Sequence, residues 1–343
     1  MPCNDSDTQP DWFWDLLDAT DPASRDKRLQ ALGLQLRDGI VRTETEGSET
    51  QAQTERTFGF KWQKRDTYES AGGRARMREW LERRYGEPRT YAFLEPSSRR
   101  AIVLDAGCGA GYSALELFGD TLENVCYLGV DVSDAVDVAR TRFAERGLDG
   151  AAFMQADITQ LPIPDASVDA VFSEGVMHHT DSTQAALTAL ARKIRPGGSF
   201  MFYVYRRKGP IREFTDDYIR DRLQDVPPDE AWAALEPLSQ LGQALGELDV
   251  EVEIPESIDL LQIPAGRISV QRLFYWHVFK AFYRPDMTLD EMNHINFDWY
   301  APRNAHRQSI DEVRAWCAEA GLDIERERVE DAGITVVARK RSS

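Results

Sequence analysis

A glycine-rich turn directly after a short apolar run is the feature that most restricts how this chain can fold. Residues 101–104 read Ala-Ile-Val-Leu, and residues 105–111 read Asp-Ala-Gly-Cys-Gly-Ala-Gly. Such an apolar run is typical of a strand buried on both faces of a parallel sheet. Glycines are required after it where the backbone turns tightly and approaches a ligand without an intervening Cβ. The pattern therefore predicts a strand, a ligand-binding turn, and a helix whose first turn offers free N–H groups.

Strand and helix patterns alternate after this turn. Apolar runs predict strands at 126–130, 152–154, 168–172 and 199–205, and helical patterns occupy 111–119, 133–146 and 181–194. Such alternation predicts a parallel sheet with helices on both faces. Near the end, a capping box that starts at Ser309 opens another helix, and 322–329 and 334–338 read as an antiparallel pair of strands.

The alternation is interrupted between residues 208 and 308, which suggests a division of the chain into four parts. We expect an N-terminal extension with lid helices (1–98), a ligand-binding core (99–207), a helical cap (208–308), and the last helix and closing strands of the core (309–343). The connection that leaves a parallel strand emerges at the carboxyl edge of the sheet, where ligands bind. The cap and residues 58–68 are therefore expected to cover the binding site.

Charge and composition restrict the partners. The 343 residues carry a formal net charge of −17, whereas binding to nucleic acid requires clustered lysine and arginine. The basic clusters at 206–208 and 339–341 are short, and we interpret them as solvated strand ends. The sequence shows neither an apolar run long enough to span a membrane nor a secretory leader. We therefore expect a cytoplasmic protein that binds neither nucleic acid nor a membrane.

The cysteines and histidines do not predict a metal site. The residues in question are Cys3, Cys108, Cys126, Cys317, His277, His294 and His306. The cysteines form no CxxC pair, and the three histidines lack the spacing of a zinc site. We therefore infer no metal.

Three acidic residues follow predicted strands and suit a nucleoside-like ligand. Asp105 ends the first strand, Asp131 ends the second, and Asp157 follows the third. A carboxylate after the second strand can accept hydrogen bonds from ribose hydroxyls. A carboxylate at 157 can accept one from an adenine amino group, between apolar neighbours that cover the ring. Each acid has helix capping or turn formation as an alternative role, but their order along the strand ends favours a shared site.

The position after Gly111 separates two ligands that use such a turn. A dinucleotide site requires a third glycine at position 112 for close packing of helix and strand, and Tyr112 stands there instead. S-adenosylmethionine (SAM) has no pyrophosphate and carries an ammonium group, which Asp105 can meet directly or through water. The residues favour SAM and leave an NAD-dependent oxidoreductase as the weaker alternative.

At this point the sequence resembles the class I SAM-dependent methyltransferases. The resemblance rests on 104–111, 129–131, 156–157, 172–179 and 195–198. Residues 58–62 (Phe-Gly-Phe-Lys-Trp) and 297–303 (Phe-Asp-Trp-Tyr-Ala-Pro-Arg) are similar to a bacterial subgroup of small-molecule methyltransferases, some of which carry a zinc ribbon whose cysteines are absent here.

The resemblance implies an α/β fold with a Rossmann-like, mostly parallel sheet. It implies seven strands with the last one antiparallel, an N-terminal helical extension, and a helical cap between strands five and six. It also implies that Glu174 and Gly175 line the SAM site.

Site residues follow from the motifs and from the resemblance. For the cofactor we expect Asp105, Gly107, Cys108, Gly109, Gly111, Asp131, Val132, Ala156, Asp157, Ile158, Glu174 and Gly175. For the substrate we expect Phe60, Trp62, Tyr68, Tyr205, Trp299 and Tyr300, with a core-edge role as the alternative for Tyr205.

Catalysis of methyl transfer mainly requires alignment of the acceptor with the methyl group and exclusion of water. A general base helps when the acceptor carries a proton. His178 and His179, in the loop after the fourth strand, are the candidates for this role, and packing or capping beside Asp181 is the alternative for each.

We therefore predict a SAM-dependent methyltransferase that acts on a small organic acceptor by in-line displacement and releases S-adenosylhomocysteine. Methylation of RNA or protein, or SAM binding without catalysis, are the alternatives. The acceptor atom stays open, and so does a homodimer contact through Trp12 and Trp14.

Overall fold

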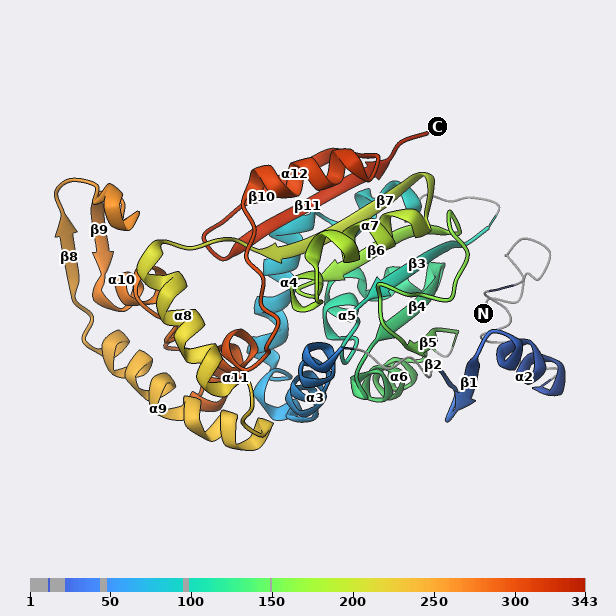
Figure 1. Ribbon diagram of the computed structural model, residues 1–343, viewed down its shortest axis with the longest axis horizontal. Coiled ribbons are helices and arrows are strands. Elements are labelled where there is room, and N and C mark those ends of the chain that lie inside the picture. The colour runs from blue at the N-terminus through green and yellow to red at the C-terminus, as the bar shows by residue number, and fades with distance from the viewer. Residues whose placement is uncertain (1–11, 13–21, 44–47, 95–98, 149, 343) are drawn as a thin grey trace.

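A nine-stranded sheet runs through the centre of the molecule in the order β1-β2-β5-β4-β3-β6-β7-β11-β10 (Figure 1). The structure is a computed structural model that describes residues 12, 22–43, 48–94, 99–148 and 150–342. Its strands are β1 (Leu34–Arg37), β2 (Ile40–Thr43), β3 (Ala101–Ala106), β4 (Val125–Asp131), β5 (Ala152–Gln155), β6 (Val168–Glu174), β7 (Ile194–Tyr205), β10 (Leu322–Val329) and β11 (Gly333–Lys340).

The predicted sheet is confirmed in its direction and corrected in its size. Strands β3 to β7 are parallel, and β11 runs antiparallel to both β7 and β10. The expected count of seven strands was wrong, because the N-terminal extension adds the β1–β2 hairpin, which joins β5 through β2. The two residues of its turn, Asp38 and Gly39, have φ of 52° and 73°. An Asp-Gly pair favours this turn, so the sequence did carry a signal for the hairpin.

The helices cover both faces of the sheet because its strands are apolar on both sides. Every residue of β3 and of β4 is buried. One face packs against α2 (Pro22–Ala31), α7 (Thr183–Lys193) and α12 (Ile310–Glu319). The other packs against α4 (Ala71–Tyr85), α5 (Tyr112–Phe118) and α6 (Ala135–Glu145). This arrangement is the one that strand–helix alternation predicts.

The segment between β7 and α12 extends to one side of the sheet, at the left of Figure 1. It contains α8 (Pro210–Leu223), α9 (Pro228–Glu247), β8 (Glu251–Ile254), β9 (Gly266–Ser269), α10 (Val270–His277) and α11 (Leu289–Tyr300). Helix α11 packs against α8, α9 and α3 (Glu49–Gln63), so this segment meets the N-terminal extension. The β8–β9 hairpin was not expected in a helical cap. Single 3₁₀ turns occupy Arg65–Thr67, Pro88–Thr90, Ala92–Leu94, Gly119–Asn124, Met177–His179 and Asp259–Leu261.

Local predictions met different outcomes. The capping box at Ser309 is present, with the Ser309 hydroxyl accepting from the Glu312 N–H. Lys208 is buried and donates to the carbonyl of Ala332, so the interpretation of its cluster as solvated was wrong for this residue. Trp12 packs against the core, and Trp14 lies outside the described residues. No helix in the described part of the chain is long and apolar enough to cross a membrane.

Asp169 ties three strands together at the amino edge of the sheet. It is buried in β6, where it accepts from the backbone N–H of Ile102 in β3 at 2.8 Å and from both terminal nitrogens of Arg99. Arg195 at the start of β7 also pairs with it.

Replacement of Asp169 by alanine should lower the free energy of unfolding by about 3 kcal/mol, because it leaves a buried N–H and a paired arginine without their acceptor. Urea unfolding measures this as a lower midpoint with an unchanged slope. Asp165→Ala is the matched control, since the Asp165 side chain is 60% exposed and its pair with Lys193 should contribute little. Equal midpoints for the two variants would contradict the role given to Asp169.

Candidate functional site

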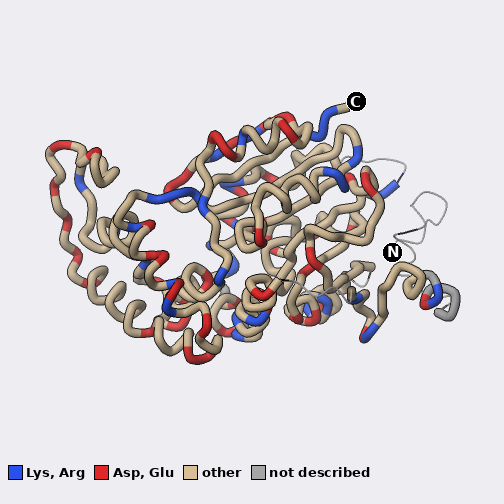
Figure 2. The backbone as a smooth tube through the Cα atoms, in the orientation of Figure 1, with Lys and Arg blue, Asp and Glu red and all other residues tan. Residues whose placement is uncertain are grey.

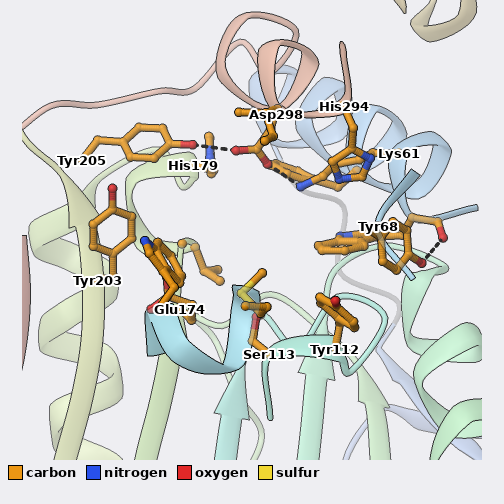
Figure 3. Close-up of a pocket in the computed structure, with 18 of the residues that line it drawn as sticks. Lys61, Tyr68, Tyr112, Ser113, Glu174, His179, Tyr203, Tyr205, His294 and Asp298 are labelled. Carbon is orange, nitrogen blue, oxygen red and sulfur yellow. Dashed lines mark hydrogen bonds and ion pairs between the residues drawn. The ribbon is translucent and has the colours of Figure 1, made fainter. Parts of the chain in front are cut away.

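A cavity of about 590 Å³ opens at the carboxyl edge of the parallel strands (Figure 3). Residues at or just after the strand ends line its lower part: Gly107, Asp131, Val132, Asp157, Ile158, Glu174 and Gly175. The other walls include residues of α3, α4, α5, α10 and α11, of the end of β7, and of the segment after α10. The structure therefore brings seven of the twelve predicted cofactor residues to one cavity.

The glycines of the turn after β3 allow close approach of other protein groups. A Cβ on Gly107 would lie 2.2 Å from a methyl group of Val176, and one on Gly109 would lie 2.8 Å from the Trp62 ring. One on Gly111 would lie 2.8 Å from Phe143. All three have positive φ, which an L side chain rarely adopts. Gly107 lines the cavity, whereas Cys108, Gly109 and Gly111 support the turn from outside it.

Asp131 and Asp157 both keep an acceptor position for a ligand. Asp131 accepts from the Gly109 N–H at 2.8 Å and from the N–H and hydroxyl of Ser133 at 2.9 and 2.6 Å. A carboxylate has about four lone-pair positions, so one stays available. In Asp157 one oxygen accepts both bonds from Thr159, and no described residue donates to the other. Their chemistry fits the hydroxyl and amino donors of a nucleoside.

Asp105 lies below the cavity and does not line it. It is 2% exposed and accepts a hydrogen bond from the Tyr127 hydroxyl at 2.6 Å. Burial raises the pKa of Asp105 to about 7. Contact with the ammonium group of a ligand would therefore require a bridging water, which was one of the two expected arrangements. Ala156 is likewise buried outside this cavity.

Glu174 lines the cavity while its carboxylate is held by α4. Tyr85 and Arg84 both donate to it, and Arg84 is fully buried between the rings of Trp80 and Tyr203, at 3.5 and 3.8 Å from their centroids. Burial raises the pKa of Glu174 to about 7. The sequence did not predict Arg84 as a buried partner of Glu174, because an arginine in a helix rich in charged residues is typically exposed to solvent.

The two candidate histidines occupy different environments. His178 is fully buried, its ring lies 3.7 Å from that of Tyr205, and neither of its nitrogens has a partner in the described structure. It does not line the cavity, whereas His179 does. The Nδ1 of His179 lies 2.6 Å from the carbonyl oxygen of Asn304, so Nδ1 carries the proton and Nε2 is left as an acceptor. No described group donates to that Nε2.

An ion pair between a buried lysine and a partly buried aspartate lies opposite the strand ends (Figure 3). Lys61 of α3 contacts one oxygen of Asp298 in α11, and the Tyr205 hydroxyl at the end of β7 donates to the other at 2.8 Å. Burial alone would raise the pKa of Asp298, but the charge of Lys61 and its hydrogen bond hold that pKa well below its usual range. Lys61 and Asp298 lie in the two motifs at 58–62 and 297–303. Sequence reasoning selected the aromatic residues of those motifs and passed over the charges.

The predicted substrate residues divide into two groups. Trp62, Tyr68 and Tyr205 line the cavity. Trp299 and Tyr300 donate to the buried carboxylate of Asp216 at 2.8 and 2.7 Å, and Phe60 packs against Trp232 and Phe297. Successive residues of a helix point about 100° apart, so Asp298 can face the cavity while its two successors face the interior of the cap. Further apolar residues of the lining are Phe58, Met77, Trp80, Tyr203, Tyr275, Phe282, Met287 and Ile295.

Comparison with known families identifies the core of this site. Residues 104–202, which carry the cavity floor, match the family model described as "Methyltransferase domain". The chain is 32% identical over 175 residues to a fatty-acid O-methyltransferase of Mycolicibacterium smegmatis, covering 51% of this chain and 57% of that protein. It is 33% identical over 142 residues to a malonyl-[acyl-carrier protein] O-methyltransferase of Serratia marcescens, covering 41% and 51%.

Two further similarities cover a smaller share of the relative or share less of its sequence. A probable tRNA methyltransferase 9B of Bos taurus is 32% identical over 131 residues, 37% of this chain and 26% of that protein. A solved Burkholderia thailandensis 1,6-didemethyltoxoflavin-N1-methyltransferase superposes with a TM-score of 0.46 at 15% identity, covering 87% of this chain and 92% of that one. The chain thus spans from about a quarter to just over half the length of the curated relatives named here.

Fold, motifs and family match agree. The glycine turn after β3 and the strands β4, β5 and β6 lie within residues 104–202, the segment that matches the family model. Residues 104–202 therefore form a domain that matches methyltransferases.

Burial of three uncharged histidines makes the fold sensitive to acid. His178, His179 and His294 are at most 7% exposed, and burial lowers the pKa of each, to about 4 for His179. The unfolded chain takes up their protons near pH 6.5, whereas the folded chain does not. Their contribution to stability is therefore complete above pH 6.5 and is lost as the pH falls toward 4, by about 1 kcal/mol per pH unit for each histidine.

His178→Phe should make this pH dependence shallower by about one proton, because phenylalanine fills the same space beside Tyr205 and does not titrate. Urea midpoints of variant and wild type at pH 7.5, 6.5 and 5.5 test this. Parallel pH profiles for the two proteins would rule out a neutral, buried His178.

Proposed function

We propose that this protein binds SAM above the ends of β3 to β6 and transfers the methyl group to a small organic acceptor. The observation that carries the proposal is the continuity of the cavity. The same 590 Å³ space is lined by the strand-end acids and by the aromatic residues of α3, α4 and the segment after α10. One enclosed space can thus hold a nucleoside-like donor and an apolar acceptor together.

The residues at the strand ends suit the donor. Asp131 offers its remaining lone pair to a ribose hydroxyl, Asp157 offers its free oxygen to an adenine amino group, and Ile158 lies beside it for contact with the ring. At Gly175, φ is +74° and a Cβ would meet nothing within 4 Å, so the backbone there leaves room for a ligand. Bound SAM supplies an electrophilic methyl group.

The walls of the cavity favour a small acceptor, and the names of two relatives favour an oxygen nucleophile. Helices α3 and α11 meet through Lys61 and Asp298, and together they cover part of the cavity. Two of the relatives are named as O-methyltransferases, one of a fatty acid and one of malonyl-[acyl-carrier protein]. The net charge of −17, with basic residues scattered among acidic ones (Figure 2), disfavours RNA as the acceptor.

His179 is the better placed general base. Its Nδ1 proton is held by the Asn304 carbonyl, so the lone pair lies on Nε2, a buried atom without a described donor, to which we assign the proton of the acceptor. Burial keeps the ring neutral, since the pKa of His179 is lowered to about 4. His178 has no access to the cavity, and we assign it to packing under Tyr205.

Calorimetric titration with SAM and S-adenosylhomocysteine tests the cofactor site. We expect micromolar binding by the wild type and at least a tenfold loss in Asp131→Ala, because a charged hydrogen bond to a ligand hydroxyl is removed. Circular dichroism checks that the variant is folded. A folded wild-type protein that binds neither compound would overturn the proposal.

His179→Gln should lower kcat about 100-fold while leaving the affinity for S-adenosylhomocysteine unchanged. Because the pKa of His179 lies near 4, its protonation should add no inflection to kcat between pH 6 and 8. His178→Gln is the matched control and should retain most of kcat. Equal losses in the two variants would indicate that His179 acts through packing alone.

A further inference from the structure

Lys280 is a buried cation of the cavity wall without a counterion. It lies between α10 and α11, is 6% exposed, and lines the cavity. Its Nζ makes no hydrogen bond or ion pair with any residue that the structure describes, and its contact is the ring of Trp299, whose centroid lies 4.8 Å away. A buried ammonium group is costly unless it is paired, so this arrangement requires an explanation.

The other cations that line the cavity are paired. Lys61 contacts Asp298, and both Arg76 and Arg284 lie 2.9 Å from oxygens of Asp286. The fourth, Arg83, lies 3.8 Å from Glu330. Lys280 therefore differs from every other basic residue of the described cavity lining.

The carboxylates near Lys280 are already occupied. Asp298 binds Lys61 and Tyr205 with its two oxygens. Asp216 accepts hydrogen bonds from Arg212 at 2.7 Å, from the indole N–H of Trp299 and from the hydroxyl of Tyr300. The charged groups that act on Lys280 are Asp298 on α11, Asp216, Arg212 and Arg220 on α8, and Lys208 before α8. Burial among them lowers the pKa of Lys280 to about 7.

We propose that Lys280 binds an anionic group of the carboxylate class on the molecule that occupies the acceptor part of the cavity. The proposal rests on the proposed function and adds the class of acceptor to it. A carboxylate of the bound molecule would serve as the counterion of Lys280, which no described residue of the protein provides. The aromatic walls would contact the apolar remainder of the molecule. Specificity follows, because a neutral analogue leaves the cation buried and unpaired.

Protonation of Lys280 couples to this binding. With a pKa near 7, much of the free protein carries a neutral Lys280 at pH 8, whereas an adjacent carboxylate favours the charged form. Binding of an anion at pH 8 should therefore take up close to one proton, and binding at pH 6 should take up much less.

Calorimetry with protein saturated by S-adenosylhomocysteine tests the proposal. The probes are octanoate and benzoate, each compared with its own amide, in two buffers of different ionisation enthalpy. We expect the wild type to bind at least one carboxylate at least tenfold more tightly than its amide, with proton uptake at pH 8. Lys280→Met should abolish the preference, and Lys280→Arg should retain the preference without the uptake.

The controls separate local effects from general ones. Lys193→Met removes a lysine at the opposite edge of the sheet, where it donates to Asp165, and should behave like the wild type. Unchanged affinity for S-adenosylhomocysteine shows that each variant is folded. Failure of the wild type to bind either carboxylate, or equal affinity for acid and amide, would overturn the role of Lys280. Failure of the wild type to bind S-adenosylhomocysteine would instead contradict the proposed function. In that case the carboxylates and amides are titrated into the protein alone, and the same comparison decides the role of Lys280.

Discussion

The buried contact between Lys61 and Asp298 is the interaction on which the rest of the site depends. It joins α3 of the N-terminal extension to α11 of the cap, and Tyr205 brings the end of β7 into the same contact. Both charges lose contact with water when the pair forms, so it contributes little to the net free energy of folding. Its main effect is to determine which surfaces of α3 and α11 meet. Further contacts support the same closure: Gln53 donates to the carbonyl of Ala301, and Thr67 hydrogen-bonds to His294.

Enclosure of the cavity determines the chemistry of the groups that line it. Removal of water keeps His179 neutral, raises the pKa of Glu174, and lowers that of Lys280. The donor side is built from backbone turns and two carboxylates, while the acceptor side is built from aromatic rings and a few charged groups. This division matches the needs of methyl transfer, in which a polar nucleoside must be held still beside an acceptor that is shielded from water.

Much of the fold was predictable because it rests on local patterns. Apolar runs and turn glycines located the parallel strands, and the capping box at Ser309 located α12. The β1–β2 hairpin was missed because its strands are only four residues each and lack strict alternation, although its Asp-Gly turn was readable. The β8–β9 hairpin was missed for the same reason of length.

The sequence by itself located the strand-end part of the cavity, where we propose that the donor binds, because Asp131, Asp157 and Gly175 lie at or just after strand ends, and strand ends in a parallel sheet converge on one edge. Only the tertiary structure decided the opposite part, where we propose that the acceptor binds. Whether a histidine or an aromatic residue faces a cavity depends on the rotation of its helix or loop against its neighbours, and no local pattern encodes this. The partners of Lys61, and the absence of one for Lys280 among the described residues, arise from contacts between segments far apart in the chain. The charged residues to which we assign roles are therefore distinguished by their burial, and burial can be read only from the folded chain.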